Sequence, residues 1–148
     1  MSLNKTDIIQ SAILKLEEKE YNLRSLIAQT RESNNDTKSS MGDKYETSRE
    51  MLQQEINMLE KQLTELLAQK EQFFKIRAED TKEVNLGALV KTSIGNLFIA
   101  AGIGELQVNG IKIMNISPLS PLAKEIARKK AGDSFVINGK QHQILDVK

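Results

Sequence analysis

Two heptad patterns separated by a short polar stretch constrain the fold of this chain most strongly. Glu20 interrupts the first pattern, in which apolar or small residues recur at alternating steps of four and three: Ile9, Ile13, Leu16, Leu23, Ile27 and Thr30. Lys70 interrupts the second pattern, which is formed by Leu52, Ile56, Leu59, Leu63, Leu66 and Phe73. Such alternation is typical of the buried seam of a coiled coil. It predicts two long helices, the first with Thr6 as its N-cap.

The polar stretch between the two patterns, residues 32–43, is rich in Ser, Asn, Asp and Gly, which favour turns. A short polar connection makes the two helices antiparallel neighbours, so the sequence predicts a helical hairpin. A helix of about 30 residues extends for roughly 45 Å, which places the turn far from the base of the hairpin. We therefore expect a coiled-coil hairpin over residues 1–78, with an exposed tip at about residues 33–46.

The pattern changes after residue 78, where short β-prone runs alternate with glycine. Two Asn-Gly pairs, at 109–110 and 138–139, predict hairpin turns with positive φ. Ser120 followed by Pro121 predicts the N-cap and first residue of a short helix, with Gly132 as its C-cap. Residues 79–148 are expected to form a small domain of four or five antiparallel strands with this helix before the last hairpin. The predicted fold class is α+β.

The composition fits an extended coiled coil joined to a small domain, because only 39% of the residues are hydrophobic and 4% aromatic. The absence of cysteine excludes disulfides and thiolate zinc sites and is usual in a reducing cytosol. The N-terminal residues lack a signal-peptide pattern, and no apolar run approaches the length of a membrane span. We therefore expect a cytoplasmic protein with no membrane partner. The net charge of +1 does not single out nucleic acid as a partner.

Three short motifs carry more specific information. They are GDKYE at 42–46, VNLGALV at 84–90, and SPLAKEIARKKAGDSFVI at 120–137. In this order they resemble the motifs of the Gre family of bacterial transcript-cleavage factors, where the first corresponds to GDLSE and the second to V-x-F-G-S-x-V. The third motif matches the family pattern without a gap and is the most specific. The resemblance implies a helical hairpin followed by a domain similar to the FK506-binding fold.

The resemblance also implies a partner and a mechanism. Gre factors insert their hairpin into the secondary channel of RNA polymerase and present an acidic tip to its catalytic centre, near the 3′ end of a backtracked transcript. Asp43 and Glu46 occupy the two acidic positions, so they are expected to help hold the second magnesium ion and orient the attacking water. Magnesium suits this role, because it prefers oxygen ligands and is usually held by few protein carboxylates. The chain itself is then no enzyme and needs no cofactor or small-molecule substrate of its own.

The expected docking surface on polymerase consists of Ser120 and Pro121 at the start of the short helix and a basic cluster around it: Lys124, Arg128, Lys129 and Lys130. Contact with RNA is an alternative use of these cations, and favourable charge at a helix C-terminus is another. His142, the only histidine, lies in an alternating strand without ligand partners nearby, and Asp36 is expected to form the turn. Phe73 and Phe74 are expected to pack at the base of the hairpin.

Four alternatives stay open at this point. Asp43 and Glu46 have the spacing of a capping box, in which both side chains bind helix amides. Thr47 and Glu50 stand where the family usually carries Asn and Tyr, which favours a regulator that binds the secondary channel without stimulating cleavage. A coiled-coil adaptor that never binds polymerase is a third interpretation. Prolyl isomerase activity is the fourth, and it requires an aromatic-lined pocket for which the second domain offers only two phenylalanines.

Overall fold

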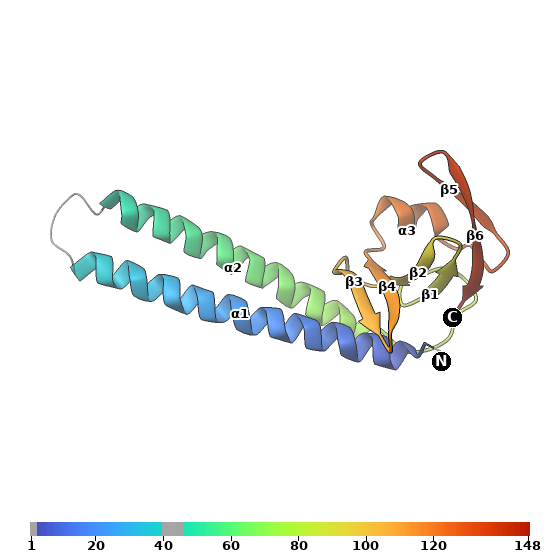
Figure 1. The fold of residues 1–148 in the computed structure, drawn as a ribbon, viewed down its shortest axis with the longest axis horizontal. Coiled ribbons are helices and arrows are strands. Elements are labelled where there is room, and N and C mark those ends of the chain that lie inside the picture. The colour runs from blue at the N-terminus through green and yellow to red at the C-terminus, as the bar shows by residue number, and fades with distance from the viewer. Residues whose placement is uncertain (1–2, 40–45) are drawn as a thin grey trace. The chain divides into compact units, whose positions relative to one another are not determined.

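The structure is a computed structural model that describes residues 3–39 and 46–148, with the side chains of residues 36–39 and 46 excepted. Two long helices precede six strands, and a short third helix lies between the fourth and fifth strands in the chain. Figure 1 shows the helical hairpin and the strands of the sheet. The predicted α+β class, a helical hairpin followed by a small β domain with one short helix, is confirmed.

The two long helices begin and end differently from the prediction. Helix α1 (Lys5–Ser39) has 35 residues and helix α2 (Glu46–Lys75) has 30. Asn4 rather than Thr6 caps α1, because the Asn4 side-chain oxygen accepts a hydrogen bond from the Thr6 amide at 2.8 Å. Helix α1 also includes residues 32–39, so the loop predicted to start at residue 32 is wrong. Asn34 is buried one heptad step beyond Thr30, so the heptad spacing continues into the stretch whose composition favours turns.

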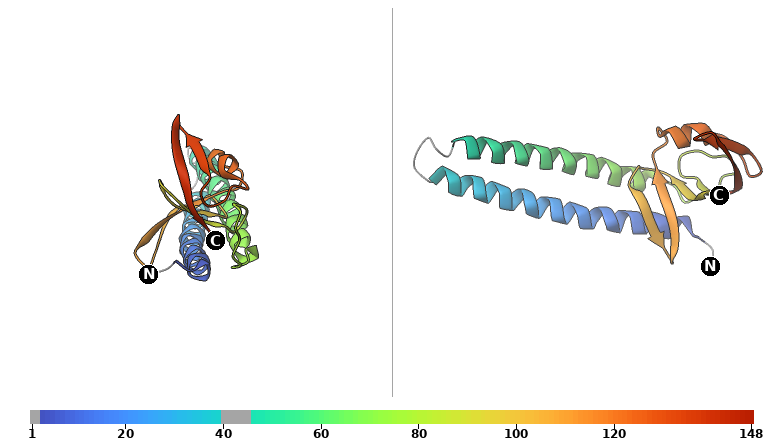
Figure 2. Two further views of the ribbon diagram at one scale, coloured as in Figure 1. Left: turned by 90° about the vertical axis from the view of Figure 1, so that its right-hand side faces the viewer. Right: turned by 45° about the horizontal axis from the view of Figure 1, so that its top comes forward.

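Contacts between the helices establish that they run antiparallel. Arg31 on α1 forms an ion pair with Glu60 on α2, whereas the earlier residue Glu20 contacts the later residue Lys70. The ribbons of α1 and α2 lie side by side in both views of Figure 2. The predicted helical hairpin is therefore present in the described part of the chain.

Burial along the helices follows the predicted seam with one shift. The buried seam residues of α2 are Ile56, Leu59, Leu66 and Phe73. Near the start of α1, Ile8 and Ala12 are fully buried, whereas the predicted seam residues Ile9 and Ile13 are only half-buried. Residues 1–13 belong to the compact unit that contains the sheet, so the coiled coil does not set their buried face.

The β domain contains one six-stranded sheet in the order β3-β4-β2-β1-β6-β5. Its strands are β1 (Leu89–Thr92), β2 (Gly95–Ile99), β3 (Gly104–Val108), β4 (Ile111–Ile116), β5 (Ser134–Ile137) and β6 (Lys140–Val147). Strands β2 and β4 run parallel, and the other neighbours run antiparallel. The sheet is thus mixed and has more strands than expected. Asn109 and Asn138 each have φ of 53°, as predicted for the two Asn-Gly hairpin turns.

The sheet buries side chains on both of its faces. On one face, Leu97 of β2 belongs to a core cluster with Ile126 and Phe135. Side chains alternate along a strand, so Phe98 points to the opposite face. There its ring centroid lies 6.5 Å from that of Phe73, in a stacked arrangement. The last turns of α2 are therefore attached to the sheet through an aromatic contact.

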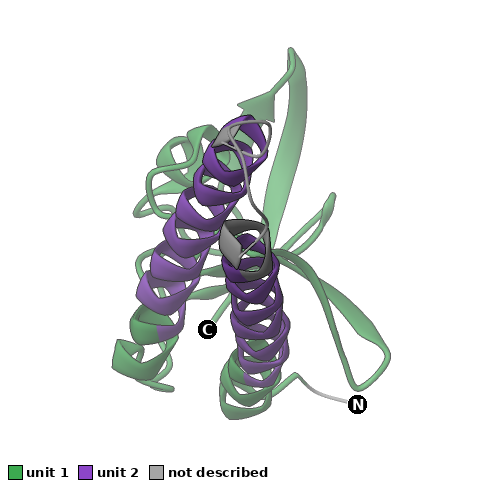
Figure 3. Cartoon of the chain, turned by 90° about the vertical axis from the view of Figure 1, so that its left-hand side faces the viewer, with its two compact units in different colours: residues 1–13, 71–148 green, residues 14–70 purple. Residues whose placement is uncertain are grey.

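The chain divides into two compact units, which Figure 3 colours separately. One unit contains residues 1–13 and 71–148, and the other contains residues 14–70. The first unit includes the start of α1, the end of α2 and the whole β domain. Among the described residues, none of the helices has the length and apolar character needed to cross a membrane.

Candidate functional site

The predicted tip carboxylates lie at the limit of what the structure describes. Asp43 lies outside the described residues, and only the backbone of Glu46, the first residue of α2, is described. Their roles in metal binding, catalysis and capping therefore stay predictions. Thr47 and Glu50, which depart from the family pattern, both have exposed side chains. Elsewhere in the described ranges, no group of three or more His, Asp or Glu side chains is placed to hold a metal ion.

The described end of the hairpin that leads to the tip has a polar seam, which the sequence patterns only partly indicated. Thr30 and Asn34 are each 7% exposed, and the Thr30 hydroxyl donates to the Leu26 carbonyl of its own helix at 2.7 Å. The Oδ1 atom of Asn34 and the Nε atom of Arg49 are buried without a hydrogen-bond partner. Buried polar atoms without partners cost free energy. This part of the seam therefore contributes less to stability than the apolar layers that precede it.

The SPLA motif forms the capped helix that the sequence predicts. Ser120 accepts a hydrogen bond at its Oγ from the Ala123 amide at 3.2 Å, and Pro121 begins helix α3 (Pro121–Ile126). Ser120 is half-buried, whereas Pro121 is exposed. Of these two predicted docking residues, Pro121 is therefore the more accessible.

Helix α3 ends earlier than predicted. Its C-cap is Ala127, and Gly132, the predicted C-cap, lies in the turn before β5. Beyond the cap, the Arg128 amide donates to the Val84 carbonyl at 2.8 Å, and the Lys129 carbonyl accepts from the Val84 amide at 2.9 Å. These bonds to the segment before β1 replace the helical bonds that a longer α3 would form. The basic residues 128–130 consequently follow the helix and do not form its last turn.

The basic side chains near α3 differ in their surroundings. Lys124, Arg128 and Lys130 are exposed. Lys129 is half-buried, and its Nζ donates to the Ser134 carbonyl at 2.9 Å. Lys129 therefore holds the turn between α3 and β5, whereas the other three predicted docking cations are exposed.

An apolar groove next to the SPLA motif was not predicted from the sequence. This basal groove has a volume of about 200 Å³ and is lined by Gln72, Lys75, Leu86, Ala100, Ser117, Pro118 and Leu119. Leu119 is 77% exposed and Leu86 is 61% exposed. Apolar side chains that gather in a concave surface with a polar rim are typical of interaction sites. The sequence signal was weak, because Leu86 and Leu119 are far apart in the chain.

A buried lysine fastens the segment that connects α2 to the sheet. Lys5 is 5% exposed, and its Nζ donates to the Glu79 carbonyl at 2.7 Å. Burial lowers the pKa of Lys5, and the negative charge of Asp80 opposes this shift. The start of α1 thus holds the connection into the β domain, within one compact unit.

The aromatic residues of the β domain pack into its cores. Phe98 is 0% exposed and Phe135 is 2% exposed, so neither lines an open pocket. The ring of His142 lies 5.5 Å from that of Phe135, which places this histidine against the core. The described residues therefore give no support to prolyl isomerase activity.

The fold is that of a helical hairpin joined to a small mixed β-sheet domain. A scan against protein-family models finds no match, and a search of curated proteins finds none either. Among solved structures, one of the transcription factor Gfh1 is similar over 93% of this chain and 93% of its own, with 14% identity and a TM-score of 0.37.

Two further solved structures are similar over 93% of this chain. The structure of Gfh1 from Thermus aquaticus is covered to 94%, with 17% identity and a TM-score of 0.38. That of GreA factor homolog 1 from Thermus thermophilus is covered to 95%, with 13% identity and a TM-score of 0.35. TM-scores this low do not establish a shared overall fold, so function is argued from the residues of this chain.

Proposed function

We propose that this chain is a regulator of bacterial RNA polymerase that enters the secondary channel with its helical hairpin and presents Asp43 and Glu46 to the catalytic centre. The antiparallel pairing of α1 and α2 is the observation that supports this most, because the sequence connecting such a pair lies at its end. The short connection between Ser39 and Glu46 includes Asp43. The three Gre-like motifs supply the link to polymerase.

Stimulation of transcript cleavage is the activity that the two carboxylates would support. Carboxylate oxygens are hard ligands suited to a magnesium ion that polymerase and RNA phosphates already hold in part. Asp43 and Glu46 would complete the ligand set and orient water, while the polymerase carries out the cleavage of its own transcript. On this proposal the chain is not an enzyme by itself and carries no cofactor of its own.

The β domain would dock on the outside of polymerase, with Pro121, the basal groove and the exposed cations as its contact surface. Exposed apolar side chains such as Leu119 can supply the core of the contact, because the buried core of an interface is more apolar than its rim. Lys124, Arg128 and Lys130 are exposed and can pair with acidic groups of the partner. Action on polymerase implies a cytoplasmic location.

A second candidate is a regulator that binds the same channel and inhibits or modulates polymerase without stimulating cleavage. Thr47 and Glu50 favour it, because they stand directly after the tip at positions where Gre factors usually carry Asn and Tyr. Both side chains are exposed and close in sequence to Glu46, so they change the chemistry near the tip. Channel binding is common to both candidates, and the fate of the transcript distinguishes them.

A backtracked-complex assay with purified bacterial polymerase tests the proposal. Stimulated cleavage that disappears in the Asp43→Asn/Glu46→Gln variant is the expected result. Reduced RNA synthesis without transcript cleavage, together with competition against a factor that binds the secondary channel, would favour the second candidate. Failure to bind polymerase at micromolar concentrations would refute both candidates and favour a coiled-coil adaptor.

A further inference from the structure

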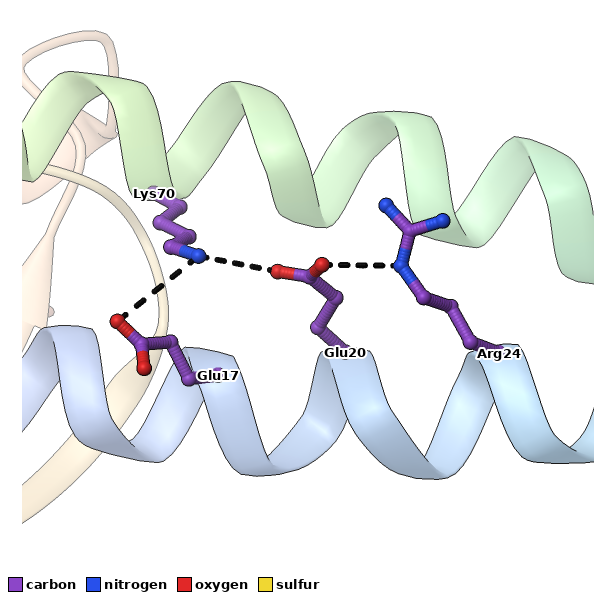
Figure 4. Close-up of polar contacts among 4 residues, drawn as sticks. All are labelled: Glu17, Glu20, Arg24 and Lys70. Carbon is purple, nitrogen blue, oxygen red and sulfur yellow. Dashed lines mark hydrogen bonds and ion pairs between the residues drawn. The ribbon is translucent and has the colours of Figure 1, made fainter.

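Glu20 and Lys70 form the centre of an ion-pair network between the two helices, shown in Figure 4. The Nζ atom of Lys70 lies 3.1 Å from Oε1 of Glu20 and 3.9 Å from Oε1 of Glu17. The second oxygen of Glu20 accepts from Nε of Arg24 at 2.9 Å. Each oxygen of Glu20 therefore has a cationic partner, one on each helix.

This pair lies in the seam of the hairpin. Lys70 and Glu20 are the residues that interrupt the two heptad patterns, and their side chains are only 21% and 19% exposed. Buried Leu16 precedes Glu20 by one heptad step, and buried Leu66 and Phe73 flank Lys70. By contrast, the Arg31–Glu60 pair lies at the hairpin surface, with side chains 58% and 43% exposed.

An apolar heptad seam does not by itself fix the longitudinal register, that is, which residue of one helix lies opposite which residue of the other. Because apolar residues recur every seven positions, a shift of one heptad brings leucine and isoleucine opposite leucine and isoleucine again. Within the seam itself, a polar position can distinguish the two alignments. One such shift would set Lys70 opposite Ile27, and the opposite shift would set Glu20 opposite Leu63.

We propose that the Glu20–Lys70 pair is a positioning element that fixes the longitudinal register of the hairpin and hence which residues form its tip. A shift of one heptad separates Glu20 from Lys70 and leaves one of the two charges opposite an apolar residue in a partly buried seam. Leaving such a charge without its partner is strongly unfavourable. A polar residue at one seam position is known to specify register in coiled coils at some cost in stability.

The consequence for the tip depends on the proposed function, whereas the register itself does not. A shift of one heptad displaces one helix by about 10 Å along the other, at 1.5 Å per residue. Such a shift would turn residues at one helix end into part of the connection between the helices. It would also move the carboxylates of Asp43 and Glu46 relative to the rest of the hairpin. A tip that must reach a catalytic centre tolerates no such displacement.

The proposal can be tested in the free protein by measuring the distance between two spin labels with pulsed electron paramagnetic resonance. The chain has no cysteine, so labels attach only at introduced sites, and Ala28→Cys with Thr64→Cys places them on opposite helices beside one groove. The parent protein is expected to give one distance. The Glu20→Leu/Lys70→Leu variant is expected to add a second, longer distance without loss of helix content or melting temperature.

Two further variants make the result specific to the pair. Reversal of the network, with Glu17→Lys, Glu20→Lys, Arg24→Glu and Lys70→Glu, is expected to restore one distance. The exposed pair serves as the matched control, and Arg31→Leu/Glu60→Leu is expected to keep one distance.

A single unchanged distance in the leucine variant would overturn the proposal, as would failure of the reversed network to restore it. If the leucine variant aggregates, Glu20→Ala/Lys70→Ala gives the same comparison. These measurements need no polymerase, so their outcome is independent of the proposed function. If both proposals hold, activity on polymerase falls in proportion to the fraction of molecules with the longer distance.

Discussion

The Lys70 ammonium donates a hydrogen bond to the Glu20 carboxylate across the hairpin at 3.1 Å, so the single polar interruptions of the two heptad patterns meet each other. Neither charged residue fits an apolar seam alone, but together their opposite charges neutralise each other. The hairpin thus contains a charged polar layer in the unit formed by residues 14–70, in addition to the uncharged polar seam at Thr30 and Asn34.

The first prediction concerns the acid stability of the hairpin. Hydrogen bonds from Lys70 and then Arg24 lower the pKa of Glu20. A carboxylate whose pKa is lower in the folded state contributes stability above its unfolded pKa of about 4.3, and this is lost as pH falls through the folded pKa. Glu20→Gln should therefore flatten the decline in unfolding free energy below about pH 4.3, measured by urea denaturation. Parallel curves for both proteins would contradict this account.

Two adjacent phenylalanines at the end of α2 give the second prediction. Phe73 is 0% exposed and stacks on Phe98, whereas Phe74, which the sequence also predicted to pack at the base, is 60% exposed. Phe73→Ala should lower the unfolding free energy by about 3–5 kcal/mol, because it leaves a cavity. Phe74→Ala is the matched control and should cost less than about 1 kcal/mol. Equal losses in calorimetry or chemical denaturation would show that the aromatic contact does not anchor the sheet.

The third prediction uses the buried lysine. Burial lowers the pKa of Lys5 in the folded state, so the unfolded chain binds more protons between that pKa and the ordinary value of about 10.4. In that interval the unfolding free energy rises with pH. Lys5→Met removes this titration, and the difference in stability between wild type and variant should grow in favour of wild type as pH increases. A difference independent of pH would contradict the inferred burial of the charge.

The fourth prediction concerns the basal groove. Leu119→Asp places a charge where the groove is most exposed and should weaken binding to polymerase by about tenfold or more, as expected for a residue central to an interface. Its melting temperature should stay unchanged, because Leu119 is 77% exposed. Val136→Asp on β5, at a residue 52% exposed, is the control and should bind normally. Similar losses for both variants would remove the groove from the contact surface.

Local patterns in the sequence were sufficient for much of the fold. Heptads predicted the hairpin, and the Asn-Gly pairs predicted two turns that have the expected positive φ at Asn109 and Asn138. The cap formed by Ser120 was also predicted, because it depends on residues next to each other in the chain.

Features that depend on distant residues were not predictable from local patterns. Arg128 ends α3 early because its amide bonds to Val84, and the parallel pairing of β2 with β4 depends on the whole sheet. Helix α1 continues through Ser39 and includes the buried Asn34, although the composition of this stretch favours turns. The basal groove combines four separate segments, so no single motif could indicate it.

The central claim is that the hairpin tip reaches the catalytic centre of RNA polymerase, and localized hydroxyl-radical cutting measures this most directly. Iron(II) in place of the catalytic magnesium of polymerase generates radicals that cut only the polypeptide close to the metal. We predict cuts in this chain confined to about residues 40–46, around Asp43, whether or not the tip stimulates transcript cleavage. A bound chain that is cut only in the β domain, or not at all, would contradict the account.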